Sequence, residues 1–241
     1  MDRRQFLGTA GAAGVLLAPG VTLVTSAGAD EGARKADPGK RWGLLIDANR
    51  CDANCDSCIK ACRQENNWDN TGTDPQDPQW IRKVTVTDKN SGHSQTLPVM
   101  CQHCAQPPCA DVCPTGASFK RPDGIVLVDR HRCIGCRYCM MACPYKARSF
   151  VHRHVEHDED FNPDVPRGKG TVEACNMCVH RVDEGMDPAC VVACRDEGKA
   201  AMVFGDLNDP NSEIAQLVAQ YATDQIRADL GLDPGVRYRG L

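Results

Sequence analysis

Sixteen cysteines stand in this chain of 241 residues, and their spacing is the first feature with chemical meaning. Near the centre, the run Cys133-x2-Cys136-x2-Cys139-x3-Cys143-Pro144 has three cysteines at two-residue gaps, a fourth three residues further on, and then proline. In this pattern the first three cysteines bind one 4Fe-4S cluster, and the fourth ligates the other cluster of a pair. The spacing therefore indicates iron–sulfur chemistry.

Three further groups of four cysteines have related spacings. The second central box is Cys101-x2-Cys104-x4-Cys109-x3-Cys113-Pro114. The outer boxes are Cys51-x3-Cys55-x2-Cys58-x3-Cys62, with one extra residue in its first gap, and Cys175-x2-Cys178-x11-Cys190-x3-Cys194. All sixteen cysteines thus fall into four boxes of four, which predicts four 4Fe-4S clusters. No nucleophile or general base is evident in the sequence, so we expect an electron-transfer subunit without catalytic residues.

Exchange of the fourth cysteine between paired boxes predicts the ligands of each cluster. Proline follows both central boxes, whereas Arg63 and Arg195 follow the outer ones, so the boxes sort into a central and an outer pair. The predicted central sets are Cys101, Cys104, Cys109 and Cys143, and Cys113, Cys133, Cys136 and Cys139. The predicted outer sets are Cys51, Cys55, Cys58 and Cys194, and Cys62, Cys175, Cys178 and Cys190.

Two other uses of cysteine stay open at this point. Pairs of the type C-x2-C also form zinc ribbons, although a zinc site needs neither the third cysteine nor the terminal Cys-x3-Cys-Pro. Disulfide scaffolds are usually shorter and denser in cysteine than this chain, in which cysteine makes up about 7% of the residues. Iron–sulfur clusters explain the spacing better than either alternative.

The first 29 residues have the features of a twin-arginine (Tat-type) export signal. Arg3-Arg4 precede a weakly apolar, glycine- and alanine-rich run, and Ala27-Gly-Ala29 resembles a cleavage site. The glycines and Pro19 make a poor membrane-spanning helix, although retention as an anchor is the alternative. Because the Tat route exports folded proteins, clusters inserted in the cytoplasm would survive export. We therefore expect a periplasmic protein that is cleaved after Ala29.

The remaining pattern predicts an α+β fold of tandem, nested bacterial two-cluster ferredoxin-like units, with short strands, loops and a C-terminal helix. Short apolar runs predict strands at 42–47, 124–129, 145–151 and 200–204, and segments 80–87 and 95–99 predict a hairpin. The expected segments are the signal (1–29), an outer ferredoxin-like unit (30–62 with 171–205), a hairpin insertion (63–100), a central ferredoxin-like unit (101–151), and the C-terminal helix and tail (206–241).

The C-terminal segment carries a helix signal. Asp209 is predicted to cap the helix with Pro210 at its first position, and an apolar stripe runs from Ile214 to Ile226. Residues 229–241 show no obvious core pattern. The histidine-rich loop at 152–170, with His152, His154 and His157, meets no metal-ligand spacing and is expected to be a solvated surface loop.

The net charge of the chain bears on its partners. The formal value of −4 becomes −5 without residues 2 to 4, which hold two arginines and one aspartate. Clusters with thiolate ligands add further negative charge. Nucleic-acid binding is therefore not expected, and docking to a positively charged partner surface is.

Residues within and beside the boxes suggest how the clusters are tuned. Replacement of proline by Arg63 and Arg195 adds positive charge, so we expect the outer clusters at higher potential. The alternative is that these arginines point to solvent or pair with acids such as Glu65 and Asp196. His103 and His180, inside the boxes, either donate to sulfur or only pack.

The four boxes, the twin-arginine start and the run from Gln102 to Pro114 (QHCAQPPCADVCP) resemble the ferredoxin-like electron-transfer subunits of membrane-bound oxidoreductases. That family includes the iron–sulfur subunits of polysulfide, nitrite, tetrathionate and dimethyl sulfoxide reductases. The resemblance covers about residues 42–204. Within the family, the C-x3-C opening at Cys51, the run 178–185 and the tail 227–238 are most similar to the DsrO group, the periplasmic iron–sulfur subunits of DsrMKJOP complexes of dissimilatory sulfur metabolism.

The resemblance implies a partner set and a function. The implied partners are a polytopic, quinone-interacting membrane subunit of the NrfD type, a small multihaem cytochrome c and other subunits of the complex. The implied function is a one-electron relay through four 4Fe-4S clusters between the quinone site and the cytochrome. The alternatives are the iron–sulfur subunit of a molybdopterin reductase of the polysulfide or tetrathionate type, a zinc-binding structural protein and, less favoured, a free soluble ferredoxin.

Overall fold

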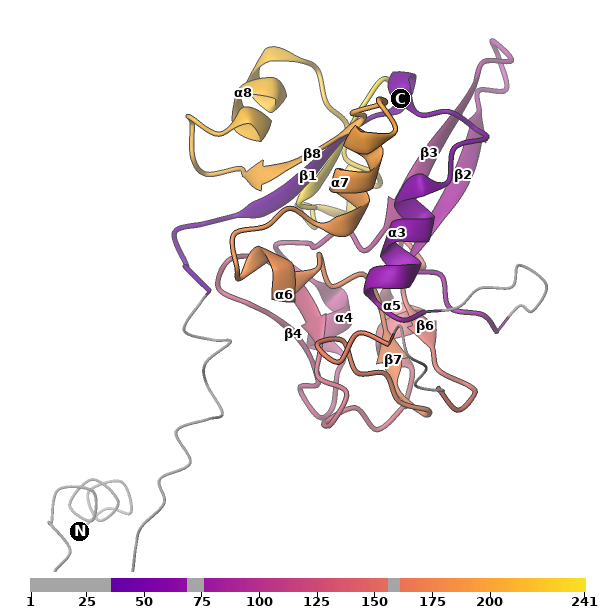
Figure 1. Cartoon of the computed structure of the whole chain (residues 1–241), viewed down its shortest axis with the longest axis vertical. Helices are drawn as coiled ribbons and strands as arrows, with labels where there is room; N and C mark the ends of the chain where they lie inside the picture. The colour runs from indigo at the N-terminus through magenta and orange to yellow at the C-terminus, as the bar shows by residue number, and fades with distance from the viewer. Residues whose placement is uncertain (1–35, 69–75, 156–160) are drawn as a thin grey trace, which may run out of the picture. The chain divides into compact units, whose positions relative to one another are not determined.

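The computed structural model describes residues 36–68, 76–155 and 161–241, which belong to one unit of the chain (Figure 1). The expected signal segment 1–29 and His157 of the histidine loop lie outside the described residues. None of the helices in these described ranges has the length and apolar character needed to cross a lipid bilayer.

Short strands and short helices alternate along the described chain. The strands are β1 (Trp42–Asp47), β2 (Ile81–Thr87), β3 (Ser94–Met100), β4 (Ser118–Lys120), β5 (Val126–Val128), β6 (Ser149–Phe150), β7 (Val172–Glu173), β8 (Met202–Asp206) and β9 (Val236–Arg239). The helices are η2 (Ala48–Arg50), α3 (Ser57–Glu65), α4 (Pro108–Asp111), α5 (Tyr138–Ala142), α6 (Val179–Val182), α7 (Ala189–Asp196), α8 (Glu213–Gln220) and η3 (Ala228–Leu230). This mixture of helices and small sheets agrees with the α+β expectation.

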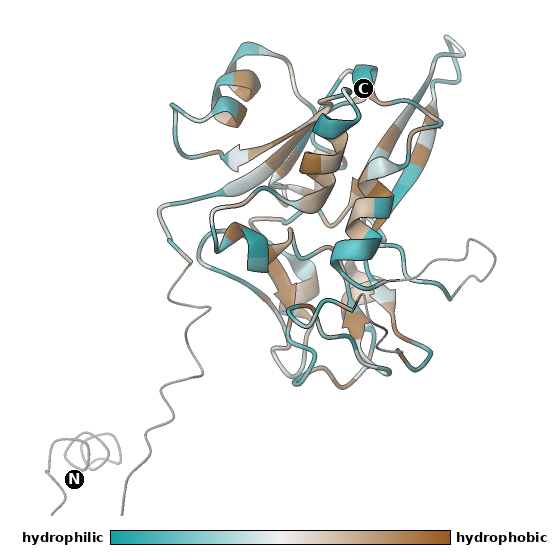
Figure 2. Ribbon diagram, in the orientation of Figure 1, coloured by the Kyte–Doolittle hydropathy of each residue, from teal (hydrophilic) through white to brown (hydrophobic). Residues whose placement is uncertain are grey.

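The largest sheet has the strand order β8-β1-β9 and joins the two ends of the described chain. The central strand β1 pairs antiparallel with β8 and parallel with β9. Its apolar run is buried on both faces, as expected for a central strand, and Leu44 and Ile46 are at most 1% exposed. Apolar segments of β1 and α7 are visible as brown ribbon in Figure 2.

Strand β9 corrects the expectation that residues 229–241 lack a core pattern. Val236 and Tyr238 are fully buried, and they alternate with the more exposed Arg237 and Arg239. The Tyr238 hydroxyl donates to the Pro98 carbonyl oxygen at 3.1 Å. This alternation is the ordinary period of a strand with one face on the core, but four residues are too few to stand out in the sequence.

The other sheets each have two strands. The predicted hairpin is present as β2 and β3, in the register Val84↔Leu97, and the turn between the strands includes Gly92. Its side chains reach the cysteine boxes, because Lys83 Nζ donates to the Cys55 carbonyl oxygen at 2.7 Å and Arg82 donates to the carbonyl oxygen of Tyr145.

Strand β5 lies within the predicted segment 124–129, and its partner β4 is an addition to the sequence prediction. The strand expected at 145–151 is limited to β6, which pairs with the unpredicted β7. Because isolated pairs of two or three residues bury little surface, their sequence signal is weak.

Helix α8 begins and ends at different residues from those predicted. Ser212, not Asp209, is the N-cap, and its Oγ accepts a hydrogen bond from the Ala215 amide at 3.2 Å. Asp209 instead accepts from the Asn211 amide at 2.9 Å and so closes a turn before the helix. The helix stops at Gln220, because Tyr221 is extended and Asp224 pairs with Tyr238 of β9, which leaves Ile226 outside the helix.

We expect replacement of the cap at Ser212 to destabilise the C-terminal region. Ser212→Ala removes the side-chain acceptor for the Ala215 amide and should cost about 1 kcal/mol of unfolding free energy. Urea unfolding under anaerobic conditions, followed by far-UV circular dichroism, measures this loss. Asp209→Ala is the matched control and should cost less; a larger loss for Asp209→Ala would mean that the sequence-predicted cap is the true one.

Candidate iron–sulfur sites

All sixteen cysteines lie within the described residues as free thiols, and they gather in four groups. Each of three groups lines a cavity of its own: Cys51, Cys55, Cys58 and Cys194; Cys113, Cys133, Cys136 and Cys139; and Cys101, Cys104, Cys109 and Cys143. The structure therefore brings together cysteines that are up to 143 positions apart, the separation of Cys51 from Cys194.

The remaining four cysteines form the fourth group, in which Cys190 lies at the centre of the interactions. Burial raises the pKa of the Cys190 thiol well above its ordinary value, and Cys178, Cys62 and Cys175 raise it further. Cys62, Cys175, Cys178 and Cys190 are all buried. The four groups contain the same cysteines as the four sets expected from the box spacing.

Helix pairing explains why the boxes exchange their fourth cysteines. Helix α3 carries Cys58 and Cys62, and it packs against α7, which carries Cys190 and Cys194. Residues four apart lie one above the other on the same helix face, so each helix offers one thiol to each outer group. In the centre, α4 with Cys109 packs against α5 with Cys139, so this helix pair brings together one thiol of each central group.

The loop of the best ferredoxin-like box depends on one glycine. Gly135, between Cys133 and Cys136, has a φ of +70°, and a Cβ there would collide with the carbonyl oxygen of Gly170. Only glycine adopts this conformation without cost and also admits such a close backbone approach. The loop can then present Cys133 and Cys136 toward the same cavity.

Backbone amides donate to sulfur in the group of Cys113 and Cys133 and in the group of Cys194. The Ser118 amide lies 3.3 Å from Cys113 Sγ, the Val172 amide 3.4 Å from Cys133 Sγ, and the Ala201 amide 3.3 Å from Cys194 Sγ. Such donors stabilise a thiolate over a thiol, which is the form that binds iron. The fit between the cysteine groups and a cluster therefore includes hydrogen bonds to the ligand atoms.

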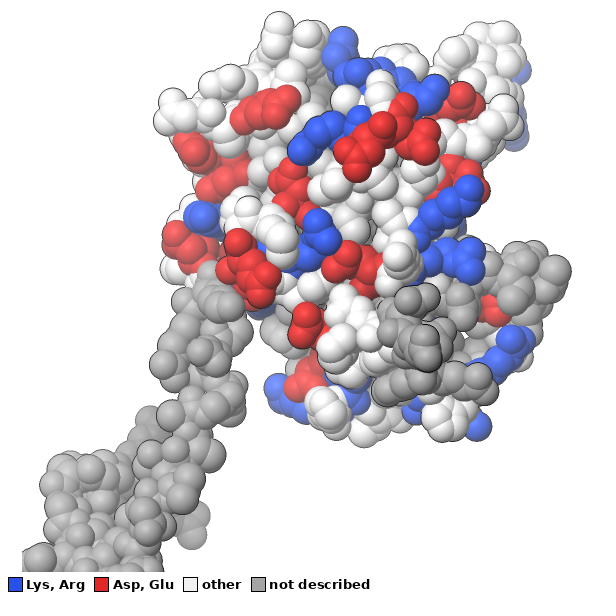
Figure 3. Space-filling view, viewed as in Figure 1, with Lys and Arg blue, Asp and Glu red and all other residues white. Residues whose placement is uncertain are grey.

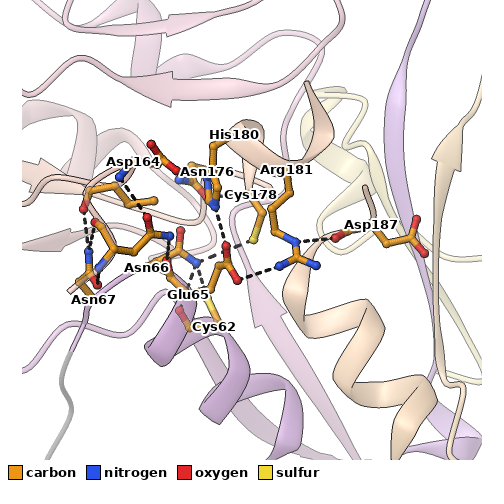
Figure 4. A network of polar contacts seen from close by, with 12 residues as sticks. Cys62, Glu65, Asn66, Asn67, Asp164, Asn176, Cys178, His180, Arg181 and Asp187 are labelled. Atoms are coloured by element: carbon orange, nitrogen blue, oxygen red, sulfur yellow. Dashed lines mark hydrogen bonds and ion pairs between the residues drawn. The ribbon is translucent and has the colours of Figure 1, made fainter. Parts of the chain in front are cut away.

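Side chains also donate to sulfur in the fourth group (Figure 4). The buried Trp68 donates its Nε1–H to Cys62 Sγ at 3.3 Å. Asn66 Nδ2 lies 3.6 Å from Cys62 Sγ and 3.8 Å from Cys178 Sγ, so it bridges ligands from both outer boxes. Sequence reasoning missed both residues, and their position just after the first box was the only available signal.

The cysteine groups differ from a mononuclear metal site. Among the residues that the structure describes, no group of three or more histidine, cysteine, aspartate or glutamate side chains could hold a metal ion. A structural zinc ion needs four ligands converging at about 2.3 Å from one point. The thiols instead surround cavities, which is the arrangement required by a cluster with an iron atom at each of four corners.

Comparison with known proteins places the chain in a family. Residues 93–159 match the domain family described as 4Fe-4S dicluster domain. The chain is 42% identical, over its full length and 98% of the relative, to the Hdr-like menaquinol oxidoreductase iron-sulfur subunit 1 of Archaeoglobus fulgidus. It is 36% identical to a tetrathionate reductase subunit of Salmonella typhimurium, covering all of this chain and 88% of the relative. It is also 33% identical to the NrfC homolog of Haemophilus influenzae, with 98% and 93% covered.

The chain belongs to the family of ferredoxin-type 4Fe-4S dicluster subunits of Hdr-like and related oxidoreductases. Its relatives are iron–sulfur subunits of oxidoreductase complexes, so the broad resemblance seen in the cysteine boxes is confirmed. The protein is accordingly an iron–sulfur electron-transfer component of membrane-bound oxidoreductases.

The two box histidines of the protein have different surroundings. His180 does not reach sulfur; its Nε2 lies 2.7 Å from a carboxylate oxygen of Glu65, which also accepts from Arg181 at 2.9 Å (Figure 4). His103 is fully buried, and its Nδ1 accepts from the Val126 amide at 3.0 Å. Burial, with the nearby charges of Arg41 and Arg148, lowers the pKa of His103 to about 3, so this ring is neutral.

The two arginines that follow the outer boxes also have defined contacts. Arg195 pairs with Asp187 at 2.5 Å, rather than with Asp196, and its side chain is 60% exposed. Arg63 lies over the ring of Trp68 at 6.0 Å from its centroid. Because solvent and Asp187 both screen the charge of Arg195, this arginine gives little support to a raised potential of the outer clusters.

We expect the Trp68 indole to raise the potential of the cluster held by Cys62. Trp68→Phe removes the donor to sulfur, and the potential of one cluster should fall by roughly 20–60 mV, if the lost hydrogen bond contributes about 0.5–1.5 kcal/mol more to the reduced state. A potentiometric titration followed by EPR measures the shift.

Trp80→Phe is the matched control. Trp80 is also buried and lies under an arginine, Arg130 at 5.8 Å, but its Nε1 has no hydrogen-bond partner among the described residues. This variant should leave all potentials in place. Equal shifts in both variants would show that loss of packing, not loss of the donor to sulfur, is responsible.

Proposed function

We propose that the protein carries four 4Fe-4S clusters on its sixteen cysteines and relays single electrons within a periplasmic, membrane-associated complex of dissimilatory sulfur metabolism. The observation that carries the proposal is the grouping of the cysteines, since each group combines three thiols of one box with one thiol of its partner box. This exchange is the ligation pattern of two-cluster ferredoxins. The clusters, when bound, supply one-electron chemistry.

The protein's own contribution is to hold, order and shield the clusters. The proposed ligand sets are Cys51, Cys55, Cys58 and Cys194; Cys62, Cys175, Cys178 and Cys190; Cys101, Cys104, Cys109 and Cys143; and Cys113, Cys133, Cys136 and Cys139. Helices α3 and α7 link the two outer groups, and α4 and α5 link the two central groups. Adjacent clusters of this kind form a path for electrons.

One cluster site reaches the surface. Cys136 is the one exposed cysteine of the sixteen, and the large apolar side chains of Ile134, Tyr138 and Met141 beside it in the sequence are exposed as well. Exposed apolar side chains around a redox site are typical of a surface that another protein covers. Electrons then pass between this cluster and a partner subunit here.

The charge distribution agrees with protein partners. On the face shown in Figure 3, acidic and basic side chains of the described residues intermingle and form no broad patch of one sign. Nucleic-acid binding would require a basic patch or stripe, so we do not propose it.

The proposed partners are an NrfD-type membrane subunit and a multihaem cytochrome c, as in a DsrO-like assignment. The full-length similarity to a menaquinol oxidoreductase component supports a quinone-interacting complex. The DsrO-like tail, residues 227–238, is part of the fold, because η3 precedes β9 on the largest sheet. Export by the twin-arginine route and the periplasmic location are supported by the sequence motif at 1–29.

A second candidate is the iron–sulfur subunit of a molybdopterin reductase. The full-length similarity to a tetrathionate reductase component favours this possibility. The two candidates share the clusters and the relay, and they differ in the protein with which the relay exchanges electrons. A structural zinc protein is a third alternative. The cysteine spacing favours it less, and its metal content would distinguish it from the other two candidates.

We expect anaerobically purified protein to contain about sixteen iron and sixteen sulfide per chain, as four 4Fe-4S clusters require. Chemical iron and sulfide analysis measures this, and EPR during reductive titration should show interacting S = 1/2 signals. Removal of the clusters should leave the chain largely unfolded by circular dichroism, since the clusters contribute folding energy. A colourless, folded protein that contains zinc would contradict the proposal.

We expect the protein to remain with its complex during mild detergent extraction. A tagged full-length chain, expressed in its own host, should co-purify with a polytopic membrane protein and with a haem-staining cytochrome c. Mass spectrometry and haem stain identify the partners. A molybdopterin-containing protein in place of the cytochrome would support the second candidate, and cleavage after Ala29 would show as a mature N-terminus at Asp30.

A further inference from the structure

An arginine outside all four cysteine boxes lies against the central cluster sites. Arg148, one residue before β6, is only 6% exposed and lines the cavity of Cys101, Cys104, Cys109 and Cys143. Its NH2 donates to Cys109 Sγ at 2.9 Å. A guanidinium is always charged, so this contact places a full positive charge beside a cluster ligand.

The charge of Arg148 also reaches the second central group. The Arg148 side chain also makes a hydrogen bond to Cys139, a thiol of the second central group. Cys109 and Cys139 belong to different central groups, so one cation interacts with both.

Comparison with another buried arginine shows what Arg148 lacks. Arg121 is equally buried, and it is neutralised by Asp123 at 2.8 Å and Asp183 at 2.7 Å. Arg148 Nε and NH1 have no hydrogen-bond partner among the described residues by distance and angle, and the partners of this side chain there are the sulfurs of Cys109 and Cys139. A buried cation requires an anion, and the sulfur ligands are the anions at hand.

We propose that Arg148 is the shared counter-cation of the two central clusters and raises their reduction potentials above those of the two outer clusters. This inference rests on the proposed function, because it requires four clusters. The first electrons that enter the protein then reside on the central pair. This order of reduction potentials, with the central clusters higher, is the reverse of the order expected from Arg63 and Arg195, which follow the outer boxes.

The physical reason is the charge that each cluster gains. Reduction adds one negative charge to a cluster that already carries about two with its thiolates. A fixed, buried cation favours the more negative state, and the low dielectric of the interior strengthens the attraction. The sign of the effect is therefore a higher potential, and it applies to both clusters that Arg148 influences.

Three cations near the outer groups should raise the potential of a cluster less than Arg148 does. Arg181 donates to Glu65, and Arg195 is paired with Asp187 in solvent. Lys83, which lines the cavity of the Cys51 group, is half-buried, and its Nζ donates to the carbonyl oxygens of residues 53 and 55. Each of these charges is paired or solvated, and so acts less on a cluster than the charge of Arg148.

The test is a potentiometric EPR titration of the anaerobically purified full chain. Arg148→Met keeps much of the buried volume and removes the charge, and it should lower the reduction equilibrium constant of two of the four clusters by about tenfold or more, or 59 mV for a one-electron couple at tenfold. Arg148→Lys should restore most of the shift. Arg195→Gln, which removes an exposed arginine next to Cys194, should change none of the potentials.

Unchanged potentials in Arg148→Met, or shifts spread over all four clusters, would overturn the proposal. If Arg148→Met loses iron, variants of the cysteine ligands identify which clusters are reduced first. One of the two signals that appear first on reduction of the wild type should be altered by Cys139→Ser, and both should be kept in Cys58→Ser; loss of an early signal in Cys58→Ser, with both kept in Cys139→Ser, also overturns the proposal. An iron count far below sixteen in the wild type would instead reject the four-cluster function itself.

Discussion

Thiols from distant boxes must meet in groups of four in the protein interior, and the rest of the structure depends on this constraint. Burial, with the neighbouring Cys194 and Cys51, raises the pKa of Cys58 to about 12. Burial also raises the pKa of Cys62 and Cys101 well above the ordinary value. Thiolates in such positions are unfavourable without a cation, so assembly of these sites is coupled to the binding of iron.

The helices and small sheets meet this constraint with little material. Pairs of short helices, α3 with α7 and α4 with α5, set the distance between boxes, and residues four apart on one helix serve two neighbouring groups. The three-stranded sheet of β8, β1 and β9 closes the unit by joining segments from both ends of the described chain. The strands of two or three residues also position donors to sulfur, since the amides of Ser118 in β4 and Val172 in β7 donate to Cys113 and Cys133.

Donors around the sulfur atoms distinguish sites that share the same ligands. Trp68 and Asn66 serve the outer group of Cys62, backbone amides serve the groups of Cys113 and Cys194, and Arg148 serves the central pair. Hydrogen bonds and charge near sulfur are the means by which a protein sets cluster potentials. A relay built from four chemically identical clusters can in this way acquire a direction of easiest electron flow.

Local spacing was enough to specify the chemistry, because the arrangement of ligands within a loop depends on adjacent residues. The cysteine boxes, the central strand β1 and the hairpin of β2 and β3 could all be predicted from continuous runs of sequence. The broad family followed from the same boxes. Tertiary structure, in contrast, decided what surrounds the sulfur atoms and how the ends of the chain are fixed. Arg148 lies 39 residues from Cys109, so no local pattern connects this donor to its acceptor.

The same reason explains the errors near the C-terminus. Strand β9 is buried only because β1 offers it an edge, and Ser212 rather than Asp209 caps α8 because the turn before the helix uses Asp209. Spacing along a chain specifies which groups can bind a cluster. The charge and hydrogen bonds that tune the cluster come from residues that only folding brings near.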